Sequence, residues 1–219
     1  DDCCEALGSR LGGRSLGSLG RAGCFGFYPN KQITTGEGGM ITTNDAALAS
    51  KLRSIRNQGR SAMGQWLEHE NLGVNYRLTE MAAALGRTQL RRIDHLLQRR
   101  AEVAAAYSAG LASVAWLRLP VTRADVERSW FVYVVELAPD GPDRDRIMHG
   151  LEARGIPTRA YFSPIHRQPY VQQRVSISPR LAATAKPGAL PVTESIASRT
   201  LALPFHTRMD EQQVRVVID

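Results

Sequence analysis

Hydrophobic and polar positions follow two different periods along this chain of 219 residues. Short runs rich in β-branched and aromatic residues predict strands at residues 24–28, 38–43, 130–137, 156–161 and 201–204. Apolar positions three and four apart, with capping residues, predict helices at residues 44–57, 79–111, 143–154 and 210–218. Asn44 and Thr79 are the expected N-caps of the first two helices. The connection 58–77 and the polar stretch 171–190 have few apolar positions.

The change in pattern after the long helix predicts two parts. We expect residues 1–112 to belong to one α/β domain and residues 113–219 to form a smaller α+β domain, because a β-α-β order follows residue 130. The fold class expected is therefore α/β.

Composition and charge exclude several classes of function. The formal net charge of +7 raises the possibility of nucleic-acid binding. The arginines are scattered, however, and basic charge alone reads no sequence, so we expect no nucleic-acid partner. No apolar run approaches 18 residues, and we expect neither a membrane span nor a signal peptide. The cysteines Cys3, Cys4 and Cys24 lack metal-ligand spacing, so we expect no metal site and read all three as reduced and buried in a cytoplasmic protein.

Lysine is rare in this sequence, which draws attention to Lys31. Of 28 basic residues only Lys31, Lys51 and Lys186 are lysines. Lys31 follows a predicted strand and precedes a glycine-rich stretch, TTGEGGM. It could be a surface lysine in a turn. Alternatively, desolvation and nearby positive charge could lower its pKa from about 10.4, so that it forms an imine with an aldehyde cofactor.

Other candidate residues also allow two interpretations. Asp2 is either a solvated carboxylate or the partner of a pyridine nitrogen. Asn75 and Arg77, just before the long helix, are either ordinary loop residues or phosphate ligands. His166, among aromatic residues and prolines, suits a structural role better than a ligand role.

Five segments together carry a family resemblance. They read DDCCEALGS, GCFGFYPNKQITTGEGGMITTND, LGVNYRLTEMAAALGRTQLRRID, RGIPTRAYFSPIHRQPY and LALPFH. In this order and spacing they resemble the DegT/StrS-type sugar aminotransferases, which use pyridoxal phosphate (PLP) on the aspartate-aminotransferase fold, type I. The resemblance implies that this chain is the C-terminal part of the PLP-binding large domain followed by the small C-terminal domain.

The resemblance also implies roles for matching residues. Lys31 matches the lysine that forms the imine with PLP, and Asp2 matches the partner of its ring nitrogen. Glu5 falls near the cofactor's phenolic oxygen. Asn75 matches the residue that reaches the phosphate in the neighbouring subunit of a homodimer, with Arg77 beside it. In the same way, Tyr161 and His166 match a segment near the sugar.

The implied activity is transfer of an amino group, with glutamate as donor, to a keto nucleotide-sugar, at the 4-position, in polysaccharide or secondary-metabolite biosynthesis. Sugar dehydratases of the family carry histidine in place of the lysine, so Lys31 argues against that activity.

Two departures from the family pattern support an alternative, a non-catalytic remnant or regulatory relative. Gly26 stands where the family has a phosphate-binding serine, and the half of the large domain that precedes Asp2 in the family is absent. We therefore expect this chain alone to bind PLP and turn over poorly.

Overall fold

The computed structural model describes residues 1–61, 67–174 and 183–219, and the chain divides into two compact units. Unit 1 contains Asp1–Ala101 and Thr122–Phe131, and unit 2 contains Glu102–Val121 and Val132–Asp219. The chain thus enters unit 2, returns to unit 1 for ten residues and enters unit 2 again. The predicted boundary between residues 112 and 113 stays a prediction. The connection 58–77 and the stretch 171–190 lie partly outside the described residues.

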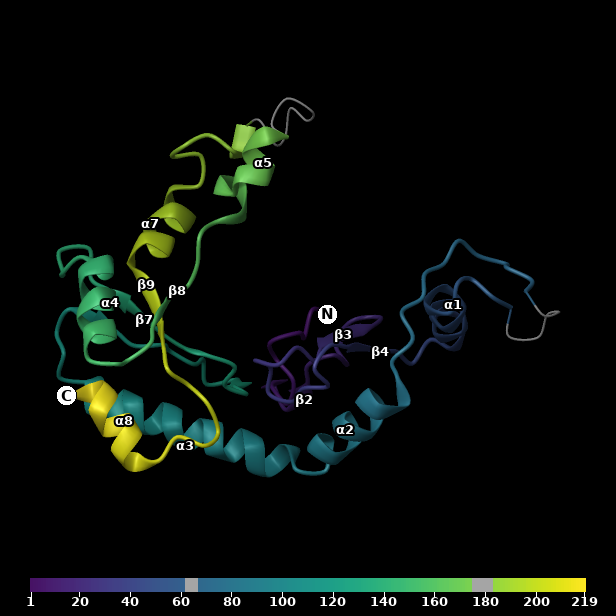
Figure 1. Cartoon of the computed structure of the whole chain (residues 1–219), viewed down its shortest axis with the longest axis horizontal. Coiled ribbons are helices and arrows are strands. Elements are labelled where there is room, and N and C mark those ends of the chain that lie inside the picture. The colour runs from purple at the N-terminus through teal and green to yellow at the C-terminus, as the bar shows by residue number, and fades with distance from the viewer. Residues whose placement is uncertain (62–66, 175–182) are drawn as a thin grey trace. The chain divides into compact units, whose positions relative to one another are not determined.

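The described residues of unit 1 form two small sheets, two complete helices and the first part of a third (Figure 1). Strand β3 (Gly23–Gly26) pairs antiparallel with β4 (Gly39–Thr42). Strand β1 (Arg10–Leu11) lies between β2 (Arg14–Ser15) and β6 (Val126–Glu127), and both pairings are antiparallel. Helices α1 (Ala46–Arg56) and α2 (Glu80–Leu90) follow, and α3 (Ile93–Leu111) runs from unit 1 into unit 2.

Local capping chemistry sets the helix boundaries in unit 1. Thr79 caps α2 as predicted, its hydroxyl accepting a hydrogen bond from the Ala82 N–H. The prediction that Asn44 caps α1 is wrong, because the carboxylate of Asp45 accepts the bond from the Leu48 N–H instead. The long predicted helix is interrupted between α2 and α3, where Arg91 and Arg92 lie.

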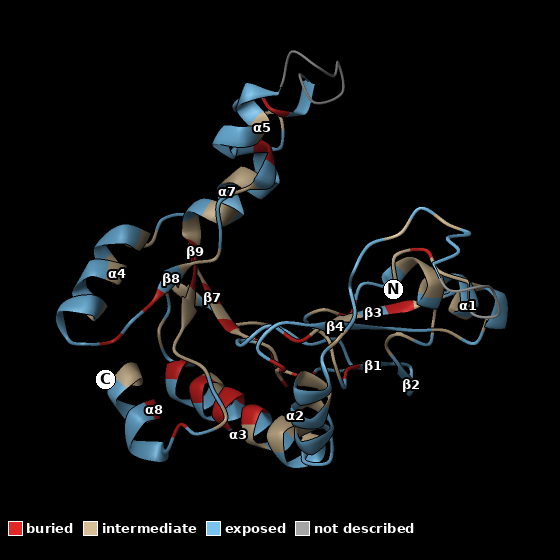
Figure 2. Cartoon of the chain, turned by 45° about the vertical axis from the view of Figure 1, so that its right-hand side comes forward, coloured by how far each residue is buried: buried red, intermediate tan, exposed pale blue. Residues whose placement is uncertain are grey.

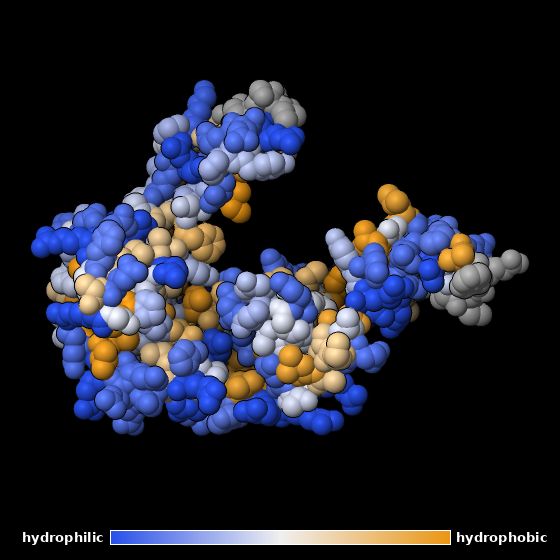
Figure 3. Space-filling model, viewed as in Figure 1, coloured by the Kyte–Doolittle hydropathy of each residue, from blue (hydrophilic) through white to orange (hydrophobic). Residues whose placement is uncertain are grey.

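The apolar positions in the first half of the predicted helix 79–111 do not enter a core. Met81 is 83% exposed and Leu85 is 44% exposed, and neither α1 nor α2 contains a buried residue. Figure 2 shows the same contrast, with α2 in tan and pale blue and buried residues on α3. Hydrophobic side chains therefore reach the surface of unit 1 among hydrophilic neighbours (Figure 3).

Unit 2 is built on a four-stranded sheet in the order β5-β7-β9-β8. The strands are β5 (Leu117–Arg118), β7 (Tyr133–Leu137), β9 (Thr200–Leu203) and β8 (Arg159–Ala160), and each neighbouring pair is antiparallel. Strands β7 and β8 are joined by α4 (Arg144–Ala153) and lie parallel with β9 between them, so the predicted β-α-β order is a split unit. The predicted strand 156–161 is shortened to the two residues of β8.

Further helices of unit 2 precede and follow β9 in the described part of the sequence. They are the 3-10 helix η1 (Ile165–Arg167), α5 (Pro169–Gln173), α7 (Pro191–Arg199) and α8 (Glu211–Ile218). Asp210 forms a capping box with Gln213 at the start of α8, close to the predicted start.

The core of unit 2 joins α3 to the sheet. Tyr107 and Tyr133 are fully buried, and their ring centroids lie 5.1 Å apart. The Tyr107 hydroxyl donates to the Pro204 carbonyl, and burial raises its pKa above the ordinary tyrosine range. Within the described residues, no helix is long and apolar enough to cross a membrane.

Candidate active site

The loop after β3 fixes the backbone of Lys31. The Lys31 N–H donates to the Tyr28 carbonyl at 3.0 Å, which closes the turn. The Phe27 N–H then donates to the Gly38 carbonyl at 2.9 Å and ties the end of β3 to the start of β4. Gly38 has φ of 147°, and a Cβ there would lie 2.5 Å from the Thr35 hydroxyl oxygen. The glycine-rich stretch is therefore needed to close this loop.

The amine of Lys31 lies between a carboxylate and an aromatic ring. Its Nζ is 3.3 Å from Oε1 of Glu5 and 4.4 Å from the centroid of the Phe131 ring. The side chain is 15% exposed. Both neighbours attract a cation. The described neighbours of the amine are thus a negative charge and a π face, and not the positive charge that the sequence analysis considered.

Asp2 lies near enough to Lys31 for the charge of the lysine to act on its carboxylate. It forms a parallel bridge with Cys24 at the start of β3. Its Oδ1 accepts a hydrogen bond from the Cys4 N–H at 3.1 Å, and this bond lowers the pKa of Asp2, with a smaller contribution from the charge of Lys31. A carboxylate with a lowered pKa stays ionised and can hold the proton of a pyridinium. The structure thus brings Asp2, Glu5 and Lys31 together.

A buried polar network supports the Lys31 loop. The Gln32 amide nitrogen donates to the Glu5 carbonyl at 2.8 Å and to the Ser129 carbonyl at 3.2 Å. The hydroxyls of Ser129 and Ser9 lie 2.8 Å apart. These bonds join residues near Asp2, the residue after Lys31 and the returning segment 122–131.

Arg100 adds a second support to the loop. Its Nη1 donates to the carbonyls of Trp130 and Phe131 at 3.2 and 2.9 Å, and its Nη2 donates to the Lys31 carbonyl at 3.4 Å. Burial lowers the pKa of this guanidinium.

Asn75 and Arg77 lie in another part of unit 1. Asn75 forms an isolated antiparallel bridge with Asn57, just after α1, and is exposed. Arg77 donates from Nη1 to Oδ1 of Asn57 at 2.8 Å. Among the contacts of the described residues, neither reaches Asp2, Glu5 or Lys31. Their exposed positions leave them accessible to another chain, and their phosphate role stays a prediction.

Tyr161 and His166 belong to unit 2. The Tyr161 carbonyl accepts a bond from the Thr200 hydroxyl at 2.7 Å, beside β9. His166 is buried, and its Nε2 lies 3.1 Å from Oε1 of Glu194. The Gly188 N–H also bonds Glu194, and it lowers the pKa of this carboxylate with a smaller effect from His166. These contacts support the structural interpretation of His166, and a role for either residue near the sugar stays a prediction.

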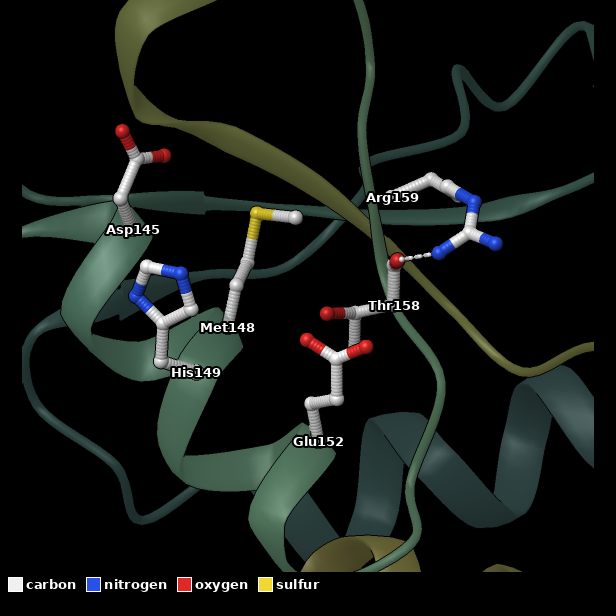
Figure 4. Close-up of a pocket in the computed structure, with 6 residues that line it drawn as sticks. All are labelled: Asp145, Met148, His149, Glu152, Thr158 and Arg159. Carbon is white, nitrogen blue, oxygen red and sulfur yellow. Dashed lines mark hydrogen bonds between the residues drawn. The ribbon is translucent and has the colours of Figure 1, made fainter.

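A shallow cavity in unit 2 has no catalytic arrangement. It has a volume of about 220 Å³ and is lined by Asp145, Met148, His149, Glu152, Thr158 and Arg159 (Figure 4). The bond drawn between these six residues runs from Arg159 to the Thr158 carbonyl. No group of three or more potential metal ligands occurs among the described residues.

The residues around Lys31 fit the aldehyde and ring-nitrogen ends of PLP. An amine and an ionised carboxylate are the groups that these two ends require. At Gly26 a Cβ would lie 3.5 Å from the Cβ of Cys4 and 3.9 Å from the Cε of Lys31, which are ordinary van der Waals contacts. The Gly26 position cannot supply a hydroxyl for the phosphate.

Sequence reasoning missed several residues of this site. Arg100 and Phe131 carried no local signal, because they reach Lys31 only through tertiary structure. The prediction that all three cysteines are buried is wrong, since Cys3 is buried, Cys4 is partly exposed and Cys24 is exposed. All three thiols are free, as predicted.

Comparison with known proteins finds similar sequences along the whole chain. The model of the DegT/DnrJ/EryC1/StrS aminotransferase family matches residues 1–219. A dTDP-3-amino-3,4,6-trideoxy-alpha-D-glucose transaminase from Streptomyces venezuelae is 36% identical over 222 residues, covering 100% of this chain and 54% of that protein. GDP-perosamine synthase from Caulobacter vibrioides is 36% identical over 223 residues, covering 100% of this chain and 56% of that protein.

A solved structure gives the same result for the fold. DesV from S. venezuelae, in complex with a ketimine intermediate, has a TM-score of 0.84 and 37% identity, covering 99% of this chain and 55% of that chain. This confirms the predicted α/β fold, and the chain spans about half the length of the relatives it matches. The match over residues 1–219 shows that the chain belongs to the DegT/DnrJ/EryC1/StrS aminotransferase family.

Proposed function

We propose that this chain is part of a PLP-dependent aminotransferase that converts a keto nucleotide-sugar to an amino sugar. The observation that carries the proposal is the meeting of Lys31, Glu5 and Asp2 within unit 1. Membership of an aminotransferase family supports it. The 36% identical relatives are named as a sugar transaminase and a perosamine synthase, which supports a nucleotide-sugar substrate. The 4-position, glutamate as donor and a cytoplasmic location are proposed as the sequence predicts them.

Each residue of the site has a separate task in this proposal. PLP, when bound, supplies an aldehyde that captures amines and a ring that accepts electrons. Lys31 holds the aldehyde end, and its amine moves a proton once it is released. Asp2 keeps the ring nitrogen protonated, which its lowered pKa favours. Glu5 lies 3.3 Å from Nζ and accepts a hydrogen bond from the charged amine.

A homodimer with shared active sites belongs to the same proposal. Asn75 and Arg77 are exposed and lie outside the Lys31 cluster, so they are free to reach a neighbouring subunit. The exposed side chains of Met81 and Leu85 support burial of α2 in a larger assembly.

The alternative is a non-catalytic remnant or regulatory relative. Gly26 in place of a residue with a hydroxyl favours it. It predicts that Lys31 is no more reactive toward PLP than an exposed lysine.

Covalent trapping separates the two. The purified chain is mixed with PLP, its absorbance is recorded near the edge of the visible range, and borohydride is added before peptide mass analysis. We expect a band that borohydride abolishes and a pyridoxyl group on Lys31 in excess over the exposed Lys51 and Lys186. Lys31→Ala should remove both signals. Equal labelling of the three lysines would overturn the proposal for this chain.

The substrate class needs a second assay. With the PLP-loaded protein, nitrogen from ¹⁵N-glutamate should appear in the sugar of a 4-keto nucleotide-sugar and to a smaller extent in that of a 3-keto one. Preference for the 3-keto substrate would refute the proposed ring position.

A further inference from the structure

A second cavity of unit 2 has a largely apolar lining. It has a volume of about 410 Å³, and its lining residues come from α3, β5, β7, β9, α4 and α8 and the segments beside them, all within unit 2 (Figure 1). Val135 and Leu201 line it and are each 1% exposed, so the cavity extends to the core of the unit. A packed core has few voids larger than a water molecule, whereas a cavity of about 300–1,000 Å³ is typical of a small-molecule site.

Helix α4 leaves part of this cavity unfilled. Ile147, Gly150 and Leu151 of α4 line it. Apart from its chain neighbours and the helix backbone, a Cβ at Gly150 would meet no heavy atom within 4 Å. The missing side chain at this position therefore leaves open space beside the helix that a ligand can occupy.

Two arginines on the same helix face give the lining a positive charge. Arg146 and Arg154 also line the cavity, and each is four residues from Gly150, a spacing that places all three on one face of the helix. Both arginines are exposed, and neither guanidinium forms an ion pair or a hydrogen bond with another of the described residues. Asp219, also exposed, is the acidic residue in the lining. Free guanidinium groups beside an apolar surface suit a ligand with an anionic head and an apolar body.

We propose that this cavity binds a small amphiphile with one carboxylate, of the class of medium-length fatty acids. The apolar chain of the ligand packs against Val135 and Leu201 and passes Gly150, and its carboxylate lies at the face of α4 that carries Arg146 and Arg154. Such a ligand stabilises unit 2, because it binds the folded cavity and not the unfolded chain. The inference does not depend on the function proposed for Lys31.

Tryptophan fluorescence and calorimetry test the proposal. Trp116 lines the cavity, and bromine quenches the fluorescence of an indole that it contacts, so ω-bromodecanoate should quench Trp116. Unlabelled decanoate should reverse the quenching, and Trp116→Phe should remove the quenching while calorimetry still detects decanoate. We expect neutral decanol to bind at least about tenfold more weakly than decanoate, because it forms no charge-assisted pair with a guanidinium.

Variants of α4 separate binding in the cavity from binding at the surface. Gly150→Leu should abolish decanoate binding because its side chain fills the open space, whereas the smaller Gly150→Ala should bind as the natural chain does. Both variants replace glycine by a better helix former, so both should fold. Arg146→Gln combined with Arg154→Gln should weaken decanoate binding by at least about tenfold and leave decanol binding unchanged. Met81→Ser, on the exposed apolar face of α2, should change neither affinity.

Three results would overturn the proposal. Decanoate binding that Gly150→Leu leaves unchanged would place the ligand elsewhere on the chain. Equal affinity for decanoate and decanol would exclude an anionic head. A dimer in sedimentation that Gly150→Leu converts to a monomer, without any binding of decanoate, would show that a second copy of the chain fills the cavity.

Discussion

Replacement of Arg100 by methionine tests whether the buried polar groups hold the Lys31 loop in place. Arg100 is 6% exposed and gives two good hydrogen bonds, at 3.2 and 2.9 Å, to the carbonyls of Trp130 and Phe131. The 3.4 Å contact with the Lys31 carbonyl is long and adds less. Methionine keeps most of the apolar volume and removes every donor.

The size of the effect follows from these bonds. Each bond from a charged donor contributes about 1.5–3 kcal/mol, and a carbonyl left buried without a donor is costly. Part of this loss is offset because a buried cation no longer has to be desolvated. We therefore expect Arg100→Met to lower the free energy of unfolding by about 3 kcal/mol. The Lys31 turn should also move more freely, so that trapping of PLP is slower.

Urea unfolding followed by circular dichroism and tryptophan fluorescence measures this change. Arg92→Met is the matched control, because Arg92 is exposed between α2 and α3. The control should stay within about 0.5 kcal/mol of the natural chain. If Arg100→Met unfolds within about 1 kcal/mol of that control, the network does not stabilise unit 1 as argued.

Three further predictions concern single side chains. Gly26→Ser should fold normally, since its Cβ would lie 3.5 Å from the nearest atom, a carbon of Cys4. The added hydroxyl should favour trapping of PLP over pyridoxal by about tenfold, because only PLP carries the phosphate. An unchanged ratio of PLP trapping to pyridoxal trapping would exclude the phosphate contact. In the folded chain the bond from Cys4 lowers the pKa of Asp2, so the stability that Asp2 contributes is present above the ordinary carboxyl range and is lost as pH falls through the lowered pKa. Asp2→Asn should therefore reduce the loss of stability at acid pH in a circular dichroism titration. Coincident titration curves of the two proteins would refute the reasoning. His166→Ala should speed limited trypsin cleavage within unit 2 because the buried ring bonds Glu194, whereas unchanged cleavage with weaker sugar binding would indicate a ligand role.

Elements with strong local signals could be predicted from the sequence. Helix α4 matches the predicted helix 143–154, and α8 matches 210–218, because periodic apolar positions and Asp caps act within a few residues. The two-residue strands β1 and β6 were not predicted, since a pairing such as Arg10 with Glu127 joins distant parts of the chain. The apolar periodicity of residues 79–111 predicted a helix but not the exposure of α2, because periodicity reports an apolar face without showing what covers it.

The residues of the candidate site also fall into those that the sequence identifies and those that only the structure identifies. Lys31, Asp2 and Glu5 could be named because the resemblance carries them on contiguous motifs. The supporting residues Arg100 and Phe131 lie far along the chain from Lys31 and act through tertiary contacts, which no local pattern reports. His166 could be assigned a structural role only once its bond with Glu194 was known.

The position of Lys31 depends on directed hydrogen bonds as well as on apolar burial. Helices α1 and α2 bury no residue, but Phe27 and Ile33, on either side of Lys31, are buried. The loop is also held by Gln32, Ser129 and Arg100, whose hydrogen bonds have fixed directions and work only when every segment is in register. Bonds from Gln32 and Arg100 end on the returning segment 122–131, which the chain supplies only after it has begun unit 2. Correct placement of Lys31 therefore requires residues that follow α3 in the sequence. A fragment that ends at Ala101 would keep Gln32 and Arg100 but lose the Ser129 and Phe131 carbonyls to which they donate.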